Sequence, residues 1–221
     1  MLDTASDLAK QRFGARPSAP VRLQITGALQ RLKIVADKHV QRTREGWLLW
    51  AAERSVEDKD GAKVVVDGKP FGLRGRIDRI DFHEQANRWA VIDYKTHSHH
   101  PMKKHYKKTT DEWIDLQLPL YRHMLDVLGI EADIEAVQLG YFNIGEREAD
   151  VRVNIAEFTP ELFASADRAI AGVVRGIREG SFPMNPNAAT SFDDYAVICQ
   201  TGVIGHMFAA DEDESVEETL S

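Results

Sequence analysis

The chain has 221 residues, the size of one domain with short extensions, and 43% of them are hydrophobic and 29% charged, as in ordinary globular proteins. No stretch approaches the ~18 apolar residues of a membrane span, and the N-terminal residues contain no apolar signal-peptide segment. Cys199 is the single cysteine, which excludes a disulfide framework and a self-contained iron–sulfur cluster and leads us to expect a cytoplasmic protein.

The net charge of −7 is concentrated at the C-terminal end. Residues 211–221 contain six acidic residues and no Lys or Arg, so the remainder holds 28 basic and 29 acidic residues. A nearly neutral body can still carry a basic face, and the overall charge therefore does not exclude nucleic acid. We expect residues 206–221 to form an acidic, disordered tail.

The first part of the chain changes from helical to strand-like patterns. Residues 1–20 are polar and read as a loose lead-in, or as the end of a larger unit. Residues 21–46 repeat apolar side chains at steps of three and four, which predicts a helix that stops at Gly46. We then expect β-structure at 47–56, 63–67, 71–82 and 88–96, with Asp67-Gly68 as a hairpin turn.

The second part predicts a helix that crosses between strands. Residues 97–111 read as a polar loop, 112–128 as a helix ending at Gly129, and 134–144 and 149–155 as strands. Thr159 is expected to cap a helix that reaches Arg178. The apolar stripe of this last helix, which we expect to pack in the core, comprises Leu162, Phe163, Ala166, Ile170, Val173, Val174 and Ile177. Beyond Gly180 the chain is rich in Pro and Asn, with a short apolar piece at 195–199. This order indicates a mixed α/β fold, in a domain that we place at 21–205.

Two carboxylates and a lysine fall at the end of the predicted 71–82 and 88–96 hairpin. With a turn around Gln85-Ala86, Asp78 would face Asp93 at a Cβ separation of about 5 Å. Asp93 and Lys95 are two residues apart and share a face. Such a group suits phosphodiester hydrolysis, because carboxylates hold Mg²⁺ or Mn²⁺ and these ions activate water. Lys95 can orient that water or stabilise negative charge on the phosphate.

The backbone carbonyl of Tyr94 lies between these side chains and is a candidate third metal ligand. The alternative reading places both carboxylates in solvent and makes Lys95 a surface ion-pair partner. The sequence Val-Ile-Asp-Tyr-Lys-Thr disfavours that alternative, because unpaired charges are costly within an apolar strand.

Three ordered motifs carry a family resemblance. They are Gly-Arg-Ile-Asp-Arg-Ile-Asp at 75–81, Ile-Asp-Tyr-Lys-Thr at 92–96 and Gln-Leu-Pro-Leu-Tyr at 117–121. Together they resemble RecB-type PD-(D/E)XK nucleases, most of all the C-terminal nuclease domain of AddB-type helicase–nuclease subunits, over about residues 21–187. The resemblance implies a restriction-endonuclease-like core, a mixed central sheet flanked by helices.

The resemblance also implies functions for named residues. Asp78 and Asp93 would bind Mg²⁺ or Mn²⁺, and Lys95 would be catalytic. Gln117 and Tyr121 would form a Q-x-x-x-Y motif that positions DNA, and residues four apart do share a helix face. The implied function is a DNA exonuclease in double-strand break repair and recombination, which acts on single-stranded ends supplied by a helicase partner or domain.

The chain departs from the family pattern in two places. The family's His ligand lies in a Gly-x-x-x-His context on an early helix, and that context is missing, so no ligand is assigned to His39. Its absence leads us to expect a fragment whose first helix is lost. The cysteines that hold an iron–sulfur cluster in some relatives are also missing, and Cys199 reads as a small buried hydrophobe. Glu53 is a weak candidate for a further acid and reads better as a surface residue.

A lysine-rich segment follows the catalytic strand. We expect Lys103, Lys104, Lys107 and Lys108 to contact phosphates and Tyr106 to stack on a base, with a solvated loop as the alternative. The four His residues here match no common zinc pattern.

Two other functions stay open at this point. One is a non-catalytic DNA-end-binding or scaffold module of the same fold, and the other is a restriction-type or junction-resolving enzyme. The retained Asp78, Asp93 and Lys95 argue against the first, and the Q-x-x-x-Y motif argues against the second.

Overall fold

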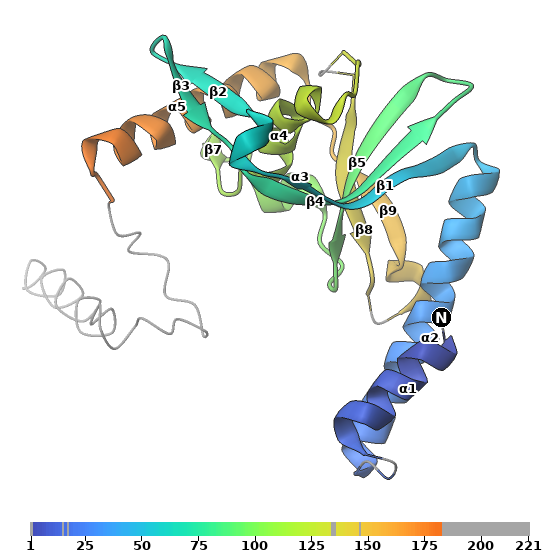
Figure 1. Ribbon diagram of the computed structural model, residues 1–221. Coiled ribbons are helices and arrows are strands. Elements are labelled where there is room, and N and C mark those ends of the chain that lie inside the picture. Colours follow the sequence, from blue (N-terminus) through green and yellow to red (C-terminus); the bar gives the residue numbers. More distant parts are fainter. Residues whose placement is uncertain (1, 15, 17, 134–135, 146, 183–221) are drawn as a thin grey trace, which may run out of the picture. The chain divides into compact units, whose positions relative to one another are not determined.

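The computed structural model describes residues 2–14, 16, 18–133, 136–145 and 147–182 (Figure 1). The expected acidic tail, the apolar piece at 195–199 and Cys199 lie outside the described residues. The chain divides into two units, Met1–Arg175 and Gly176–Ser221, and the first contains the sheet. In the described part of the chain, no helix has the length and apolar character needed to cross a membrane.

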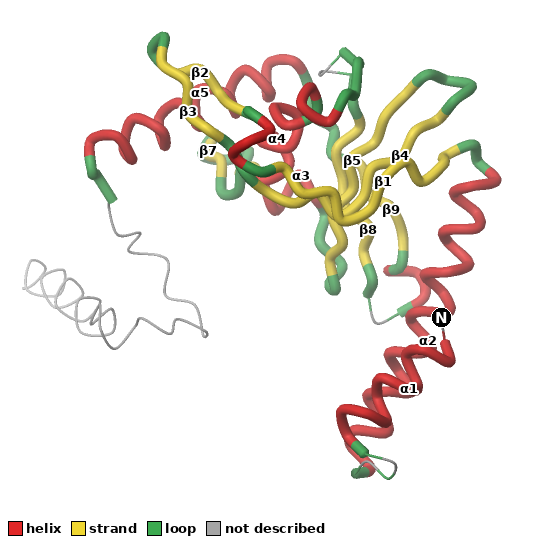
Figure 2. Tube along the Cα trace, viewed as in Figure 1, coloured by secondary structure: helices red, strands yellow, loops and turns green. Residues whose placement is uncertain are grey.

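A five-stranded mixed sheet forms the centre of the first unit (Figure 2). Its strands are, in spatial order, β1 (Trp47–Val56), β4 (Gly75–His83), β5 (Arg88–Lys95), β8 (Gln138–Asn143) and β9 (Arg152–Ile155). Strands β5 and β8 run parallel, whereas the other neighbours are antiparallel. A parallel pair needs a crossover, and the chain between β5 and β8 supplies it with helix α4 (Gln117–Tyr121). The predicted fold class, a mixed sheet flanked by helices, is confirmed.

Shorter elements surround this sheet. The remaining α-helices are α1 (Leu2–Phe13), α2 (Ala19–Arg44), α3 (Pro101–His105) and α5 (Pro160–Glu179). The 3-10 helices are η1 (Asp58–Asp60), η2 (Arg122–Met124), η3 (Asp126–Leu128) and η4 (Glu148–Asp150). Two small hairpins pair β2 (Lys63–Val66) with β3 (Lys69–Gly72) and β6 (Tyr106–Lys107) with β7 (Glu112–Trp113).

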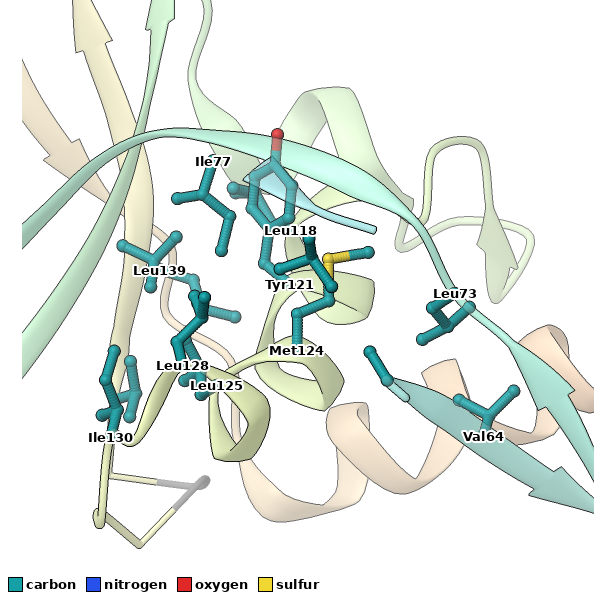
Figure 3. Close-up of a cluster of buried hydrophobic side chains, with 14 of the residues drawn as sticks. Val64, Leu73, Ile77, Leu118, Tyr121, Met124, Leu125, Leu128, Ile130 and Leu139 are labelled. Atoms are coloured by element: carbon teal, nitrogen blue, oxygen red, sulfur yellow. The ribbon is translucent and has the colours of Figure 1, made fainter. Parts of the chain in front are cut away.

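Each face of the sheet has its own apolar cluster. On one face, Leu139 packs with buried residues of α4 and the β2–β3 hairpin (Figure 3), and Val91, Tyr141 and residues of α5 belong to the same cluster. On the other face, Ile92 and Phe142 pack with Val35 of α2 and with Trp47. Because side chains alternate along a strand, neighbouring residues of β5 serve different clusters.

Two glycines, Gly46 and Gly68, end a helix and form a hairpin turn where the sequence predicts them. Asp67 and Gly68 have φ of 53° and 73°, as the two central residues of a tight hairpin turn require. Gly46 follows α2 with φ of 93°, and a Cβ there would lie 2.7 Å from Nε2 of His83. Gly68 and Gly46 therefore occupy positions that favour glycine, because a positive φ is strained for residues that carry a Cβ.

Several predicted element boundaries were wrong. The expected loose lead-in contains α1, which packs along α2, and Pro20 lies in the first turn of α2, where no N–H is needed. The expected strand 71–82 is broken at Leu73, whose N–H donates to the carbonyl of Ala62 at 2.8 Å and turns the chain from β3 into β4. The 97–111 loop contains α3 and β6.

The helix expected at 112–128 begins at Gln117, because Glu112 and Trp113 pair with β6 instead. Thr159 does precede α5, and its Oγ1 accepts from the N–H of Leu162 at 3.3 Å. The apolar stripe of α5 is only partly buried, since Val173 and Ile177 are 54% and 43% exposed. Ile177 belongs to the second unit.

Candidate active site

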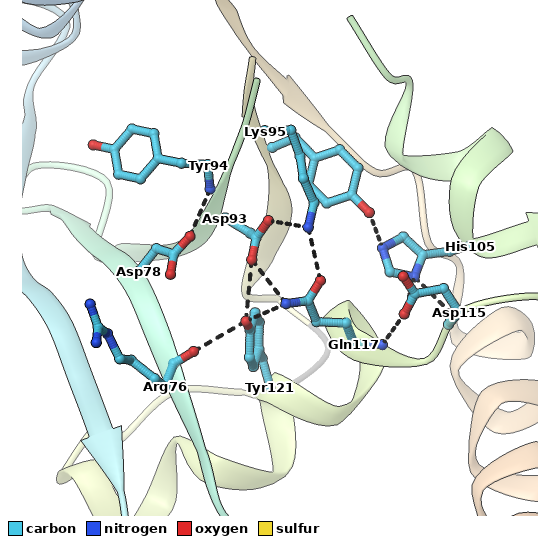
Figure 4. Close-up of polar contacts among 10 residues, drawn as sticks. Arg76, Asp78, Asp93, Tyr94, Lys95, His105, Asp115, Gln117 and Tyr121 are labelled. Carbon is cyan, nitrogen blue, oxygen red and sulfur yellow. Dashed lines mark hydrogen bonds and ion pairs between the residues drawn. The ribbon is translucent and has the colours of Figure 1, made fainter. Parts of the chain in front are cut away.

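Asp93 and Lys95 lie on the same face at the end of β5, as their spacing predicts. Lys95 Nζ is 2.6 Å from Oδ2 of Asp93, and the Asp93 side chain is 5% exposed (Figure 4). The ammonium group also lies 5.2 Å from the ring centre of Tyr141 on the neighbouring strand β8. A buried carboxylate is therefore held against a lysine that still reaches solvent, with 27% of its side chain exposed.

Asp78 reaches the same end of the sheet from β4. The predicted hairpin register is confirmed from Phe82–Trp89 to Arg79–Ile92, where the ladder ends. Asp78 and Asp93 do not form the expected ladder pair. Instead, Oδ2 of Asp78 accepts the backbone N–H of Tyr94 at 2.9 Å, replacing the main-chain hydrogen bond where the strands part.

The two carboxylates still influence each other. Burial raises the pKa of Asp78, the hydrogen bond from Tyr94 opposes this, and the charges of Asp93 and Glu53 raise the pKa further. Lys95 lowers it. The site therefore carries unfavourable carboxylate repulsion, which a cation placed between the carboxylates would relieve.

Helix α4 adds Gln117 and Tyr121 to this group. The amide Nε2 of Gln117 donates to Asp93 Oδ1 at 3.0 Å, and its Oε1 accepts from Lys95 Nζ at 3.2 Å. The hydroxyl of Tyr121 accepts from Gln117 Nε2 at 2.8 Å and lies 3.3 Å from Asp93 Oδ1 and 3.2 Å from the carbonyl of Arg76. Gln117 thus bridges the acid and the lysine, and Tyr121 supports the bridge (Figure 4).

The donor set fits a divalent metal ion that prefers oxygen ligands. Oδ2 of Asp93 is buried and has no hydrogen-bond partner, although the Lys95 ammonium lies beside it. The N–H and carbonyl of one strand residue point to the same neighbouring strand, so the carbonyl of Tyr94 projects to the Asp78 side. No group of three His, Cys, Asp or Glu residues suited to a metal occurs among the described residues. Two carboxylates and one carbonyl are the ligands that this site offers.

A buried histidine behind the site was not predicted. His105, in the segment read as a loop, is fully buried, and its Nε2 lies 2.5 Å from the hydroxyl of Tyr141. Its Nδ1 lies 2.7 Å from the carbonyl of Asp115 and must donate, because a carbonyl only accepts. Asp115 also accepts the N–H of Gln117 at 2.7 Å. No local signal in the sequence marks His105 as buried, because its partner Tyr141 lies on the distant strand β8.

The structure also places two residues that received no firm role from the sequence, Glu53 and His39. Glu53 has a left-handed φ of 54°, pairs with the exposed Arg76, and contributes to the raised pKa of Asp78. His39, on α2, lies on the opposite face, where it contacts Arg79 and Phe142. The structure therefore does not bring His39 to Asp93.

The lysine-rich segment lies on α3, β6 and the turn after them. Lys103, Lys104, Lys107 and Lys108 are exposed, and none has a carboxylate within ion-pair distance in the part of the chain that the structure describes. Tyr106 packs against Trp113, with ring centres 5.3 Å apart, and its hydroxyl donates to Asp111. His105 links this segment to Tyr141, which lies under Lys95.

The model of the PD-(D/E)XK nuclease superfamily matches residues 2–200. The chain belongs to the PD-(D/E)XK nuclease superfamily. A search of curated proteins gave no match to it. Membership implies a nuclease that binds DNA, and PD-(D/E)XK nucleases generally use divalent metals such as Mg²⁺. The RecB-like and AddB-type placement and the limits of the domain remain predictions.

Proposed function

We propose that this chain is a Mg²⁺- or Mn²⁺-dependent DNA exonuclease of the cytoplasm. It would be the nuclease part of a RecB-like, AddB-type helicase–nuclease, acting in double-strand break repair and recombination. One observation supports hydrolysis above all: Asp93, Lys95 and Gln117 form a closed hydrogen-bonded and ionic group beside Asp78. The exonuclease role and the helicase partner rest on the resemblance of the three motifs.

The metal would be held by Asp78, Asp93 and the carbonyl of Tyr94. When bound, it lowers the pKa of a ligand water and offsets charge on the phosphate. Two hydrogen bonds fix the position of Tyr94. Its backbone N–H donates to Asp78, and its phenol oxygen accepts from Arg79 at 3.2 Å. The ligand carbonyl would therefore be positioned from both faces of the sheet.

Lys95 would act on the reacting phosphate. Its ammonium is held by Asp93 and Gln117, yet a quarter of the side chain reaches solvent. A fixed positive charge near the scissile bond stabilises negative charge that develops during hydrolysis. Gln117 and Tyr121 would hold the side chains of Lys95 and Asp93 in fixed positions relative to each other.

DNA would approach along the lysine-rich segment. Beside it lies a pocket of about 610 Å³, whose apolar and aromatic wall is formed by Met102, Tyr106 and Leu162 and whose polar lining consists of His100, Lys103, Lys108 and Glu157. Lysines at the rim would neutralise phosphates, and the apolar wall would accept an unpaired base. This combination favours single-stranded ends over duplex DNA as the substrate.

Lys95→Ala provides the test. With Mg²⁺ or Mn²⁺, wild type should degrade linear DNA, and the variant should lose about 10²-fold to 10³-fold in rate while still binding Mn²⁺ in calorimetry. Lys59→Ala, an exposed lysine on η1, is the control for the loss of one charge.

A different result would change the assignment. If wild type binds DNA ends but cuts none with either metal, the non-catalytic end-binding or scaffold function is correct. Cutting of closed circular DNA would contradict the exonuclease part alone.

A further inference from the structure

A second polar site lies on the face of the sheet opposite Asp93 and Lys95. It is a pocket of about 300 Å³ between α2, β8 and β9, lined among others by Lys38, Gln41, Arg42, Glu45, Phe142 and Arg152. Phe142 pairs in register with Tyr94, and both point away from the face that holds Asp93. The proposed cleavage chemistry uses none of these lining residues.

Arg42 is the buried base of this pocket. Its side chain is 9% exposed, its Nε donates to Oδ2 of Asp81 at 2.6 Å, and its guanidinium lies 4.5 Å from the ring centre of Trp47. The second terminal nitrogen, Nη2, is buried and has no hydrogen-bond partner. A guanidinium N–H that is removed from water without a partner is costly, so the protein itself satisfies the Arg42 guanidinium only in part.

The buried charges around Arg42 do not balance. Asp81 is fully buried and is shared by two guanidinium groups, those of Arg42 and Arg79. Arg79 is otherwise in contact with the phenol of Tyr94 and the imidazole of His39. Burial and the charge of Arg79 lower the pKa of His39, Asp81 opposes this, and Arg42 lowers it further; an imidazole, neutral or protonated, supplies no negative charge to balance the guanidinium groups. One positive charge is left over inside the protein, which favours an anion nearby.

The rim of the pocket adds to this excess. Lys38 and Arg152 line it, and neither has a carboxylate within 4 Å among the described residues. The one acidic lining residue named above, Glu45, is exposed and accepts from Gln41 Nε2 at 2.9 Å. Three cationic side chains therefore face the pocket against one carboxylate.

We propose that this pocket binds a phosphate group, with the Arg42 guanidinium at its base and Lys38 and Arg152 at its rim. The surplus of positive charge favours a dianion over a singly charged carboxylate. The volume exceeds that of phosphate alone, so the group is either free phosphate or the phosphate of a mononucleotide. The site does not depend on the proposed exonuclease function.

The test measures thermal unfolding of the full chain without divalent metal. Inorganic phosphate, dAMP and acetate are compared with sodium chloride at equal ionic strength, since a ligand that binds only the folded state raises Tm. Phosphate should raise Tm, and acetate should not. A rise with dAMP as well identifies a bound mononucleotide, whereas a rise with phosphate alone identifies the free ion; both support the site.

Lys38→Ala combined with Arg152→Ala should weaken phosphate binding by about tenfold or more, because two of three cations are lost. Lys33→Ala combined with Arg44→Ala removes the same charge from α2 outside the pocket and should bind as wild type. The indole N–H resonance of Trp47, which stacks on Arg42, should shift with phosphate. Equal binding by both double variants, equal effects of acetate and phosphate, or an unchanged Trp47 resonance would overturn the proposal.

Discussion

Ionisation of Asp78 carries an energetic cost in the folded protein. Burial is the largest cause of its raised pKa, and Asp93 and Glu53 add to it against the hydrogen bond from Tyr94 and the charge of Lys95. For a carboxyl whose folded-state pKa is raised, the folded protein binds the proton more tightly than the unfolded chain. The stability that protonated Asp78 contributes is therefore lost as pH rises from the pKa of the unfolded chain toward the pKa of the folded protein. Above that range, the ionised Asp78 carboxylate lowers the free energy of unfolding.

Asp78→Asn should consequently stabilise the protein and inactivate it. The amide oxygen can still accept the N–H of Tyr94, while the repulsion with Asp93 and Glu53 disappears. We expect Tm at pH 7 without metal to rise by about 2 to 4 °C, and cleavage to be lost. Scanning calorimetry and a DNA degradation assay measure the two effects. Asp37→Asn, an exposed change on α2, should alter neither, and a lower Tm for Asp78→Asn would show that the carboxylate stabilises the fold.

At the scale of elements, the site forms where the end of β5 contacts the short helix α4. Asp93 and Lys95 are placed by the two-residue period of a strand, and Gln117 and Tyr121 by the four-residue period of a helix. Those periods are visible in the sequence, so the members of the group were predictable. The contact between the elements was not, because it depends on where α4 starts, and Asp115 and the β6–β7 hairpin determine that start.

The same reasoning explains what the sequence could not reveal. His105 lies among exposed His and Lys residues, and nothing local distinguishes it from them. Its burial arises from Tyr141 on β8, 36 residues later in the chain. Likewise, Asp78 was expected to pair with Asp93, but the strands separate one pair earlier, at Arg79 and Ile92. Contacts between residues far apart in the chain decide both outcomes, and a single sequence does not show which distant residues will be in contact.

Gln117→Ala tests the coupling between α4 and β5. The change removes the bridge from Asp93 to Lys95 and leaves both side chains in place. Loss of a partner that orients a metal ligand weakens metal affinity or activity by about 10-fold to 100-fold. The Mg²⁺ concentration for half-maximal cleavage should therefore rise. Gln24→Ala, on the exposed face of α2, is the control, and an unchanged Mg²⁺ requirement would show that Gln117 does not orient Asp93.

The lysine-rich segment predicts a salt effect. If Lys103 and Lys107 each neutralise one phosphate, Lys103→Ala with Lys107→Ala should flatten the dependence of log K on log salt by about 1.4 for single-stranded DNA. Fluorescence anisotropy with a labelled oligonucleotide over a range of salt concentrations measures this slope. Lys59→Ala with Lys69→Ala, in the β1–β3 region, is the charge-matched control. An unchanged slope in the first variant would place DNA elsewhere on the protein.

At the scale of the whole sheet, two polar systems of opposite charge lie back to back. The Asp78 and Asp93 carboxylates face one side, and Arg42 and Arg79 lie on the other. Tyr94 belongs to both, because its N–H binds Asp78 while its phenol accepts from Arg79. Side-chain alternation along β4 thus keeps Arg79 on the face opposite the proposed metal site, and Arg79 still helps to fix the position of the ligand carbonyl through the Tyr94 phenol.

The stability of the whole chain should fall in mild acid, because His105 is buried in its neutral form. Burial lowers its pKa, and Nε2 accepts the Tyr141 hydroxyl, so protonation there would break that hydrogen bond. A lowered folded pKa means that the unfolded chain binds the proton first, starting near pH 6.5. The free energy of unfolding, measured in urea, should therefore decrease below about pH 6.5, by at most about 1.4 kcal/mol per pH unit for this group.

His105→Gln keeps a donor and an acceptor without the titration and should flatten the decrease, whereas His97→Gln, an exposed change, should not. An equally steep decrease in His105→Gln would assign the acid sensitivity to other groups, with His39, whose pKa is also lowered by burial, as the first to examine.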